Sequence, residues 1–296
     1  MHRPFRFGVV TGNAQSHTEW VTLARKAEEL GYATLLIPDR TTMGLAPFTA
    51  LAVAAEATTA LRIGSFVFCN DYRHPALLAK EVATLDLLSQ GRFELGLGVG
   101  AGPVDYKQLG LPFESAGARV SRLEEALHII KRLFSEEVAN FSGKYYTITD
   151  MKGLPRPVQK PYLPIFIGSA GKRMLSIAAQ QADIIAITFK MTAQGVDPSD
   201  ATPQQKLAWV REAAGERFAQ LELSQTAYYI AITGSQASVA SQTRGLPSFI
   251  PSIPMSVEQA VAHLLEQREQ YGYSYIQVND AQMESFAPVV AQLIGK

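Results

Sequence analysis

This 296-residue sequence has a single cysteine, no cluster of histidines and a formal net charge of zero. Cys69 is the single cysteine, which excludes a disulfide framework and a cysteine-rich zinc site, and the five histidines are too scattered to indicate a metal site. No Gly-x-Ser-x-Gly motif supports a serine hydrolase. Because Lys+Arg and Asp+Glu both total 27, net charge gives no reason to expect nucleic acid or an acidic membrane as a partner.

Long apolar runs are also missing. The N-terminal segment "MHRPFRFGVV" has too short an apolar part for a signal peptide, and no segment is long enough to span a membrane. Together with the single cysteine, this composition predicts a protein of the reducing cytoplasm. The 47% hydrophobic content is ample for a full core.

Short apolar segments instead alternate with amphipathic ones along the chain. About eight segments have the pattern of buried strands, and each is followed by residues at helical spacing. Strands without clean polar alternation are typical of a parallel sheet covered by helices. The pattern predicts an α/β fold, a (β/α)8 TIM barrel, with an open doubly wound sheet as the alternative. The expected strands are 5–10, 33–39, 62–68, 93–98, 165–169, 183–188, 226–233 and 273–278.

The helix signals fit one barrel domain over 1–296. Ser16 and Glu19 have the spacing of a capping box, and Pro47 and Pro75 stand where helices begin. The expected helices are 16–31, 47–59, 75–90, 120–134, 171–181, 204–221, 257–265 and 283–294. Irregular insertions at the C-terminal face of the strands are expected near 136–163, with a short hairpin predicted within 145–164, and near 189–203 and 234–255.

A barrel of this kind has its active site at the carboxyl ends of its strands. Asp39 ends an apolar strand there and is expected either to accept a hydrogen bond from a polar ring or to pair with Arg40. His74 precedes Pro75 and indicates a helix start rather than a ligand. The same rule nominates Thr11–Asn13, Asp39 and Arg40, Ser65–Asp71, Gly98–Tyr106, Gly168–Lys172, Thr188–Lys190, and Asn279 and Asp280.

The stretch "RFELGLGVGAG" has glycines at 96, 98, 100 and 102. It is not a dinucleotide fingerprint, because the glycines alternate without a break, Pro103 follows, and several strand–helix units precede it. Glycine at this place either lets a flat ligand approach the backbone or allows tight packing at the barrel mouth. The stretch alone leaves both alternatives open.

The segment "IGSAGKR" is a glycine-bearing turn that leads from a strand into a helix. Free backbone N–H groups at a helix N-terminus bind phosphate, and Lys172 and Arg173 add positive charge. Thr188 on the next strand offers a hydroxyl. We therefore expect a phosphate site here, with a plain connecting loop as the alternative.

Several segments resemble the bacterial luciferase-like superfamily. They are "HTEWVTLARKAEELGYATLLIPDR", "RHPALLAKEVATLDLLSQGRFELGLGVG", "KPYLPIFIGSAGKRML" and "REQYGYSYIQV". The branch they most resemble comprises oxidoreductases that use the deazaflavin coenzyme F420. The resemblance covers roughly residues 5–280 and implies a TIM barrel with insertions, a homodimer, and F420 or FMN with its ring at the barrel mouth. It implies hydride transfer to or from ring C5, or oxygen chemistry in flavin-dependent members.

The resemblance also implies roles for individual residues. Asp39 matches the carboxylate beside the cofactor ring. A non-proline cis peptide would end the third strand at Ser65–Phe66 or one bond later, so that Ser65, Phe66 and Val67 back the ring. The remaining positions matched to cofactor binding are Gly98, Gly100 and Tyr106 after the fourth strand, and the phosphate turn Gly168, Ser169, Ala170, Gly171 and Lys172 with Thr188 beside it.

Two residues depart from the sugar-phosphate dehydrogenases of this branch. They have His where this chain has Arg40, and a catalytic Glu where it has Pro103. Arginine cannot act as a base at ordinary pH, so glucose-6-phosphate oxidation is not expected. The resemblance then favours reduction of a small carbonyl or enone, with Asp39 and Arg40 as catalytic residues. Arg40 is expected to hold an anionic substrate or to stabilise negative charge on a carbonyl.

Three functions therefore compete. The first is an F420-dependent oxidoreductase acting on a small-molecule substrate, the second an FMN-dependent monooxygenase supplied by a separate flavin reductase, and the third a non-catalytic flavin-binding relative. The motifs barely discriminate among them.

Four aromatic residues have no assigned role. Phe189, Tyr229 and Phe249 are expected either to line an apolar pocket or to pack ordinarily, and Trp209 is expected to lie in the core or an interface.

Overall fold

The computed structural model describes residues 3–100, 102–192, 195–242 and 252–296. Its main sheet has the strand order β3-β2-β1-β15-β12-β9-β8-β5-β4, and β3 also pairs with β5, so the sheet closes into a parallel barrel. This confirms the TIM barrel and excludes the open doubly wound sheet. The eight barrel strands are β1 (Arg6–Val10), β2 (Thr34–Ile37), β3 (Arg62–Ser65), β5 (Phe93–Gly98), β8 (Ile165–Ser169), β9 (Ile184–Ile187), β12 (Glu222–Thr226) and β15 (Tyr273–Asn279).

The chain divides into two compact units, which are described separately. One comprises 1–11, 22–36 and 168–296, and we call it the C-terminal unit; the other comprises 12–21 and 37–167, and we call it the N-terminal unit. Helix α1 (His17–Glu29) contributes residues to both. The prediction of a single domain over 1–296 stays a prediction.

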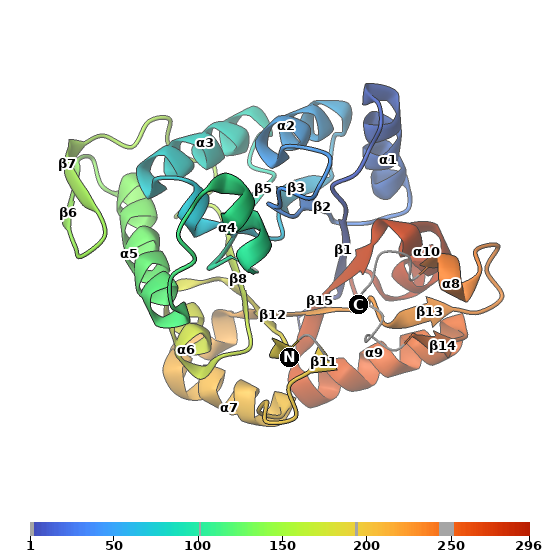
Figure 1. Ribbon diagram of the computed structural model, residues 1–296. Coiled ribbons are helices and arrows are strands. Elements are labelled where there is room, and N and C mark those ends of the chain that lie inside the picture. Colours follow the sequence, from blue (N-terminus) through green and yellow to red (C-terminus); the bar gives the residue numbers. More distant parts are fainter. Residues whose placement is uncertain (1–2, 101, 193–194, 243–251) are drawn as a thin grey trace. The chain divides into compact units, whose positions relative to one another are not determined.

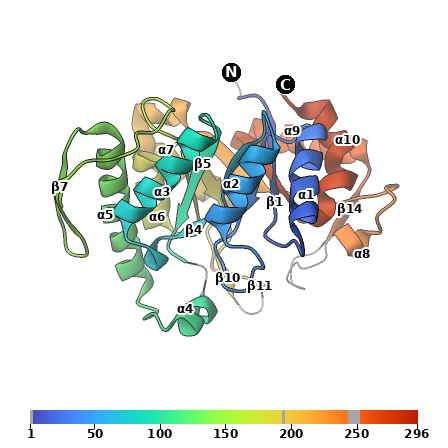
Figure 2. The same ribbon diagram turned by 90° about the horizontal axis from the view of Figure 1, so that it is seen from above.

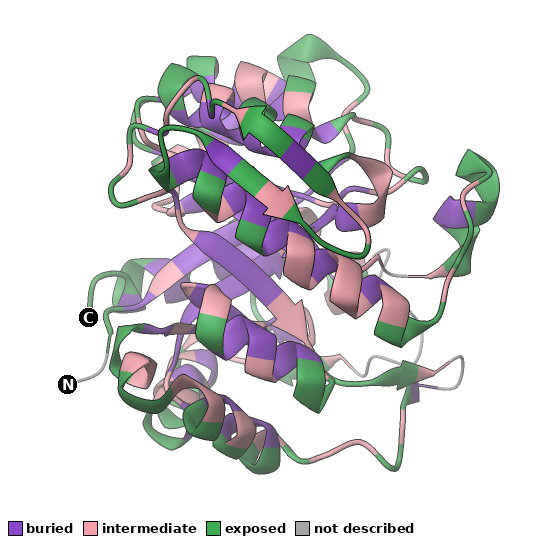
Figure 3. Ribbon diagram, turned by 90° about the vertical axis from the view of Figure 1, so that its left-hand side faces the viewer, coloured by how far each residue is buried: buried purple, intermediate pink, exposed green. Residues whose placement is uncertain are grey.

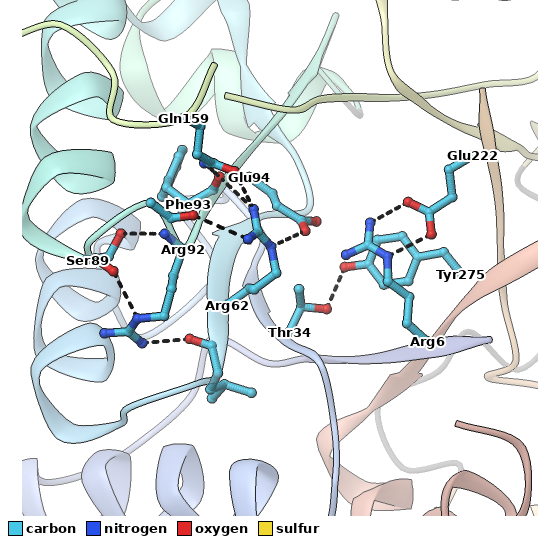
Figure 4. Close-up of polar contacts among 12 residues, drawn as sticks. Arg6, Thr34, Arg62, Ser89, Arg92, Phe93, Glu94, Gln159, Glu222 and Tyr275 are labelled. Carbon is cyan, nitrogen blue, oxygen red and sulfur yellow. Dashed lines mark hydrogen bonds and ion pairs between the residues drawn. The ribbon is translucent and has the colours of Figure 1, made fainter. Parts of the chain in front are cut away.

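Within the C-terminal unit, β1 and β12 both pair in parallel with β15. Gly8 of β1 is glycine because a Cβ there would lie 2.5 Å from the Thr34 hydroxyl oxygen. Arg6 donates to the Glu222 carboxylate at 2.6 and 2.7 Å and stacks over the Tyr275 ring, 3.6 Å from its centroid (Figure 4). The unit's helices are α6 (Lys172–Gln181), α7 (Pro203–Ala214), α8 (Val239–Gln242), α9 (Val257–Tyr271) and α10 (Met283–Leu293).

Within the N-terminal unit, α3 packs against both α2 and α5. The hairpin of β6 and β7 stands beyond α5 in Figures 1 and 2. The hairpin was predicted within 145–164, and only β7 lies there, so its first strand begins earlier than predicted. Arg62 ties β3 to β5 by donating to Glu94 at 2.6 Å and to Gln159 at 2.9 Å (Figure 4). The other elements are α2 (Pro47–Ala57), β4 (Phe68–Cys69), α3 (Pro75–Leu88), α4 (Pro103–Leu109), α5 (Ala116–Ser135), β6 (Ala139–Ser142) and β7 (Thr147–Met151).

Burial explains the continuous apolar pattern of the strands. In Figure 3 the strands of the main sheet are mostly purple, whereas the hairpin of β6 and β7 is largely exposed and the helices alternate between buried and exposed residues. Every residue of β2, β5 and β9 is buried. Helices cover the outer face of each strand, so neither face needs polar residues to meet water.

The predicted seventh strand, 226–233, is wrong. The barrel strand is β12, Glu222–Thr226, whereas β13 (Ile230–Ile232) pairs with β14 (Ile253–Met255) in a separate two-stranded sheet. The sequence "ELSQT" looks too polar for a core strand, but two of its polar side chains have partners on neighbouring strands. Glu222 pairs with Arg6, and the Ser224 hydroxyl donates to Gln277 Oε1 at 2.8 Å.

Several other boundaries differ from the prediction. The helix predicted over 204–221 ends at Ala214, because Gly215 turns the chain with φ +54° into a 3-10 segment. The third strand is interrupted between β3 and β4, and α4 was not predicted. At the first helix, the Ser16 hydroxyl accepts the Glu19 N–H at 3.1 Å, but the Glu19 carboxylate accepts from Gln15, so only half of the capping box forms.

Among the described residues, every helix is too short or too polar to cross a membrane.

Candidate functional site

Asp39 follows β2 in the N-terminal unit and is 8% exposed. Its carboxylate accepts two hydrogen bonds from Arg73, at 2.5 and 3.2 Å, and a third from the Cys69 backbone N–H at 3.1 Å. The predicted alternative of a pair with Arg40 is therefore wrong. Arg73, which the sequence analysis did not single out, neutralises this carboxylate and fixes its direction.

Arg40 is held by a different carboxylate. Its Nε donates to Asp105 Oδ2 at 2.8 Å, while the backbone N–H and hydroxyl of Thr41 donate to Oδ1 at 2.9 and 2.8 Å. Burial opposes ionisation of Asp105, but the hydrogen bonds from Thr41 and Arg40 outweigh it and hold its pKa below the usual value. Asp105 reaches this place because α4 begins at Pro103, which puts it in the first helical turn.

Ser65, Phe66 and Val67 form the interruption after β3. The Ser65 hydroxyl donates to the Gly96 carbonyl at 2.7 Å and accepts the Gly96 N–H at 3.0 Å. The peptide bond Phe66–Val67 is cis, which is the second of the two positions that the resemblance implied. Phe66 and Val67 are half-buried, and the Phe66 ring lies 5.3 Å from the Phe166 ring.

Packing accounts for three of the strand-four glycines. A Cβ on Gly96 would lie 2.0 Å from the Ser65 carbonyl oxygen, and one on Gly98 would lie 2.7 Å from Val67 Cγ2. Gly100 has φ +83°, and its Cβ would meet the Tyr106 hydroxyl at 2.5 Å. The tight-packing alternative is thus confirmed at these positions, while ligand contact at Gly98 and Gly100 stays a prediction.

Tyr106 lies under the loop after β5 with its side chain buried. Its hydroxyl donates to Asp71 Oδ2 at 2.8 Å and lies 3.4 Å from Cys69 Sγ, and Asp71 also pairs with Arg122 at 3.0 Å. Burial, followed by the hydrogen bonds and charges of Cys69 and Asp71, raises the pKa of the Tyr106 hydroxyl, so it stays protonated. In this position Tyr106 supports the loop after β5, and its contact with the cofactor stays a prediction.

The N-terminal unit has an open cavity of about 530 Å³ at the end of β2. Asp39 and Arg40 both line it, so the structure brings together the two predicted catalytic residues. The whole lining is Asp39, Arg40, Thr41, Met43, Gly44, Leu45, Ala46, Pro47, Tyr72, Arg73, Leu109 and Leu111. Only Asp39 and Arg40 of these residues were predicted as site residues. For Arg73, the "YRHP" stretch just after a strand end was a usable signal.

The glycine turn Gly168–Lys172 lies in the C-terminal unit, where β8 leads into α6. Gly171 is the N-cap of α6 and no side chain caps the helix; a Cβ there would meet nothing within 4 Å. Thr188 lies beside the turn, because its N–H donates to the Ser169 carbonyl at 2.9 Å. An open cavity of about 460 Å³ is lined by Ala170, Gly171, Lys172, Lys190, Ser199, Asp200, Ala201, Gln205 and Trp209.

The remaining candidate residues that the structure describes do not line either of these two cavities. His74 is the N-cap of α3 and accepts the Ala76 N–H at 3.3 Å, which confirms it as a helix start. The Tyr229 hydroxyl lies 3.1 Å from His263 Nε2, and Phe189 is 54% exposed. Phe249 lies outside the described residues. In the part of the chain that the structure describes, no cluster of His, Cys, Asp and Glu has the makings of a metal site.

The family model of luciferase-like monooxygenases matches residues 3–286. The chain belongs to this family. An F420-dependent glucose-6-phosphate dehydrogenase of Microbacterium testaceum is 31% identical over 204 residues, which cover 66% of this chain and 58% of that protein. An F420-dependent hydroxymycolic acid dehydrogenase of Mycobacterium tuberculosis is 29% identical over 242 residues, 79% of this chain and 64% of that protein. The chain thus matches less than two thirds of the length of these family members.

Several solved structures share the fold at low sequence identity. The coenzyme F420-dependent tetrahydromethanopterin reductase of Methanopyrus kandleri superposes with a TM-score of 0.79 at 18% identity, covering 99% of both chains. A long-chain alkane monooxygenase superposes with a TM-score of 0.78 at 14% identity, covering 99% of this chain and 92% of that one. The barrel alone therefore does not separate deazaflavin chemistry from flavin chemistry within the family.

Proposed function

We propose that this luciferase-like protein is an F420-dependent oxidoreductase that transfers a hydride between the cofactor and a small organic substrate, a carbonyl compound or an enone. The observation behind the proposal is the end of β2, where Asp39 and Arg40 line a cavity of ligand size. The curated relatives described above are named as F420-dependent, and this favours the deazaflavin over FMN.

The residues present fit such a cofactor. The N-terminus of α6 is uncapped and has open space at Gly171, and a helix N-terminus of this kind holds phosphate oxygens through backbone N–H groups. Gly168, Ser169, Ala170, Gly171 and Lys172 would hold the phosphate, with Thr188 beside them. Asp39, Ser65, Phe66, Val67, Gly98, Gly100 and Tyr106 would hold the ring.

When bound, F420 supplies or accepts a hydride at C5 of its ring. Asp39, oriented by Arg73, offers an ionised acceptor for a ring N–H. Arg40 donates hydrogen bonds and stays charged, so it stabilises negative charge on a substrate oxygen but cannot remove a proton. These two roles favour reduction of a substrate over oxidation of an alcohol, with the proton delivered from water or from a nearby Tyr, Asp or His.

An FMN-dependent monooxygenase supplied by a separate reductase is the second candidate, favoured by the family description and by the fold shared with the alkane monooxygenase. A non-catalytic flavin-binding relative is the third, since Arg40 and Pro103 replace residues with proton roles in sugar-phosphate dehydrogenases. A homodimer, a single domain over 1–296 and a cytoplasmic location are part of the same proposal.

An anaerobic turnover assay tests the proposal. Reduced F420 is mixed with the protein and a panel of enones and ketones, and the visible absorbance of the oxidised deazaflavin is followed. We expect acceptor-dependent reoxidation that is lost in Asp39→Ala. If reduced F420 binds but no acceptor reoxidises it, while reduced FMN and oxygen give an oxygenated product, the monooxygenase takes its place.

A further inference from the structure

We infer that the cavity at the end of β2 selects substrates that have a carboxylate on an apolar body, with the carboxylate held by the two terminal nitrogens of Arg40. This inference rests on the proposed function, because it names a substrate class for the same site. It concerns residues of the N-terminal unit alone.

The guanidinium of Arg40 is only partly used. Its Nε donates to Asp105 at 2.8 Å, and this is its one hydrogen-bond partner among the described residues. The edge formed by Nη1 and Nη2 has no acceptor among the described residues. Because Arg40 is 35% exposed and lines the cavity, these donors are available to a ligand. Two parallel N–H donors match the two oxygens of a carboxylate, which is why arginine binds carboxylates bidentately.

Asp105 fixes the guanidinium of Arg40 through Nε and leaves the two terminal nitrogens, Nη1 and Nη2, free to bind a ligand. The carboxylate is 1% exposed and both of its oxygens are engaged, one by Arg40 Nε and the other by Thr41. Asp105 does not line the cavity. A ligand beside Arg40 therefore meets N–H donors rather than the oxygens of Asp105.

The other arginine in the lining is already saturated. Arg73 binds both oxygens of Asp39, and its guanidinium carbon lies 5.0 Å from the centre of the Phe48 ring. These two charged side chains neutralise each other, so Arg40 is the group left to attract an anion. A cationic ligand would find no acceptor carboxylate that is not already paired.

Apart from Thr41 and Tyr72, the other side chains of the lining are apolar, and they favour a ligand with an apolar body. Met43, Leu45, Pro47, Leu109 and Leu111 supply aliphatic surface, and the cavity of about 530 Å³ has the size of a small-molecule site. Leu109 is 47% exposed, so apolar surface faces the cavity without a protein partner. An unsaturated or keto acid with a hydrophobic tail meets both requirements.

Cinnamate and cinnamamide are a matched pair of probes for this site, because they differ only in the charged carboxylate. We expect calorimetric titration of the full-length protein at neutral pH to give about tenfold tighter binding of cinnamate. Arg40→Gln should remove the difference between the two probes, and Arg40→Lys, which keeps the charge without the two parallel donors, should retain only part of it. Arg132→Gln on α5 is the control and should leave the preference unchanged.

Folding is checked by circular dichroism and thermal unfolding of each variant, and Arg40→Lys keeps the test valid if Arg40→Gln is unstable. Equal affinity for acid and amide, no saturable binding of cinnamate, or an Arg40 variant that keeps the full preference would each overturn the inference. The anionic groups of the cofactor are the other source of a matching oxyanion. If F420 displaces cinnamate and Arg40→Gln weakens F420 instead, Arg40 serves the cofactor and the substrate assignment is wrong.

The proposed function fails in a different way. It fails if F420 is not bound or its hydride is not transferred, and a preference for cinnamate can persist in that case. Conversely, turnover of neutral enones without any preference for acids would overturn the inference and leave the F420-dependent activity standing.

Discussion

A substitution at Gly171 should change protein stability and phosphate binding in opposite directions. Gly171 is the N-cap of α6 with φ −87° and ψ 139°, a conformation open to any residue, and a Cβ there meets nothing within 4 Å. Aspartate is a preferred N-cap residue, so Gly171→Asp should stabilise the helix by a few tenths of a kcal/mol, with about 0.3–1 kcal/mol more from the helix dipole. The melting temperature should rise by roughly 1–2 °C.

The same carboxylate should oppose phosphate binding. It would compete for the N–H groups of the first turn and lie about 5 Å from a singly charged phosphate, which costs about 1–3 kcal/mol at effective dielectric constants between those of a protein surface and water. We therefore expect F420 to bind about 5- to 150-fold more weakly. Gly171→Asn caps the helix without the charge and should lose less affinity. If Gly171→Asp binds F420 as tightly as the parent, the turn does not hold phosphate.

Three further predictions concern the N-terminal unit. Asp39→Ala should abolish turnover while the protein stays folded at 25 °C; a large loss of melting temperature with normal turnover would make Asp39 structural. Gly98→Ala should destabilise the protein by about 1–3 kcal/mol in urea unfolding because its Cβ would meet Val67 at 2.7 Å. Gly102→Ala, with nothing within 4 Å, should lose only the smaller preference for glycine at the N-cap of α4, and equal effects would refute the packing argument. Because the folded-state pKa of Asp105 is lowered, its carboxylate contributes stability above the ordinary aspartate pKa and loses it as pH falls. The difference in unfolding free energy between the parent and Asp105→Asn, about 1–3 kcal/mol at pH 7, should therefore shrink below about pH 4, and a constant difference would contradict the assignment.

Local sequence patterns predicted the elements whose boundaries depend on local chemistry. The strands "FELGLG" and "IFIGS" coincide with β5 and β8, because both are apolar runs bounded by turn residues. The turn at Gly168–Lys172 was predicted for the same reason. The seventh strand was missed because the partners of Glu222 and Ser224 come from β1 and β15, far away in the sequence.

The charged pairs of the site could not be predicted from sequence. Asp39 has an adjacent arginine, Arg40, yet its partner is Arg73, 34 residues further on, and Arg40 instead pairs with Asp105. Which pairs form is decided by the loop after β3 and by α4, whose packing depends on tertiary contacts. Pro103 before an acidic residue was a local signal for α4, since proline favours the first helical position.

The central claim is that this chain binds F420 in preference to FMN. A side-by-side fluorescence titration of the purified apo-protein with the two cofactors tests it directly. The proposal predicts saturable quenching of deazaflavin fluorescence at micromolar F420, weakened in Gly171→Asp, with no comparable binding of FMN. Tight binding of FMN without binding of F420 would contradict the proposal and make the flavin-dependent monooxygenase the better description.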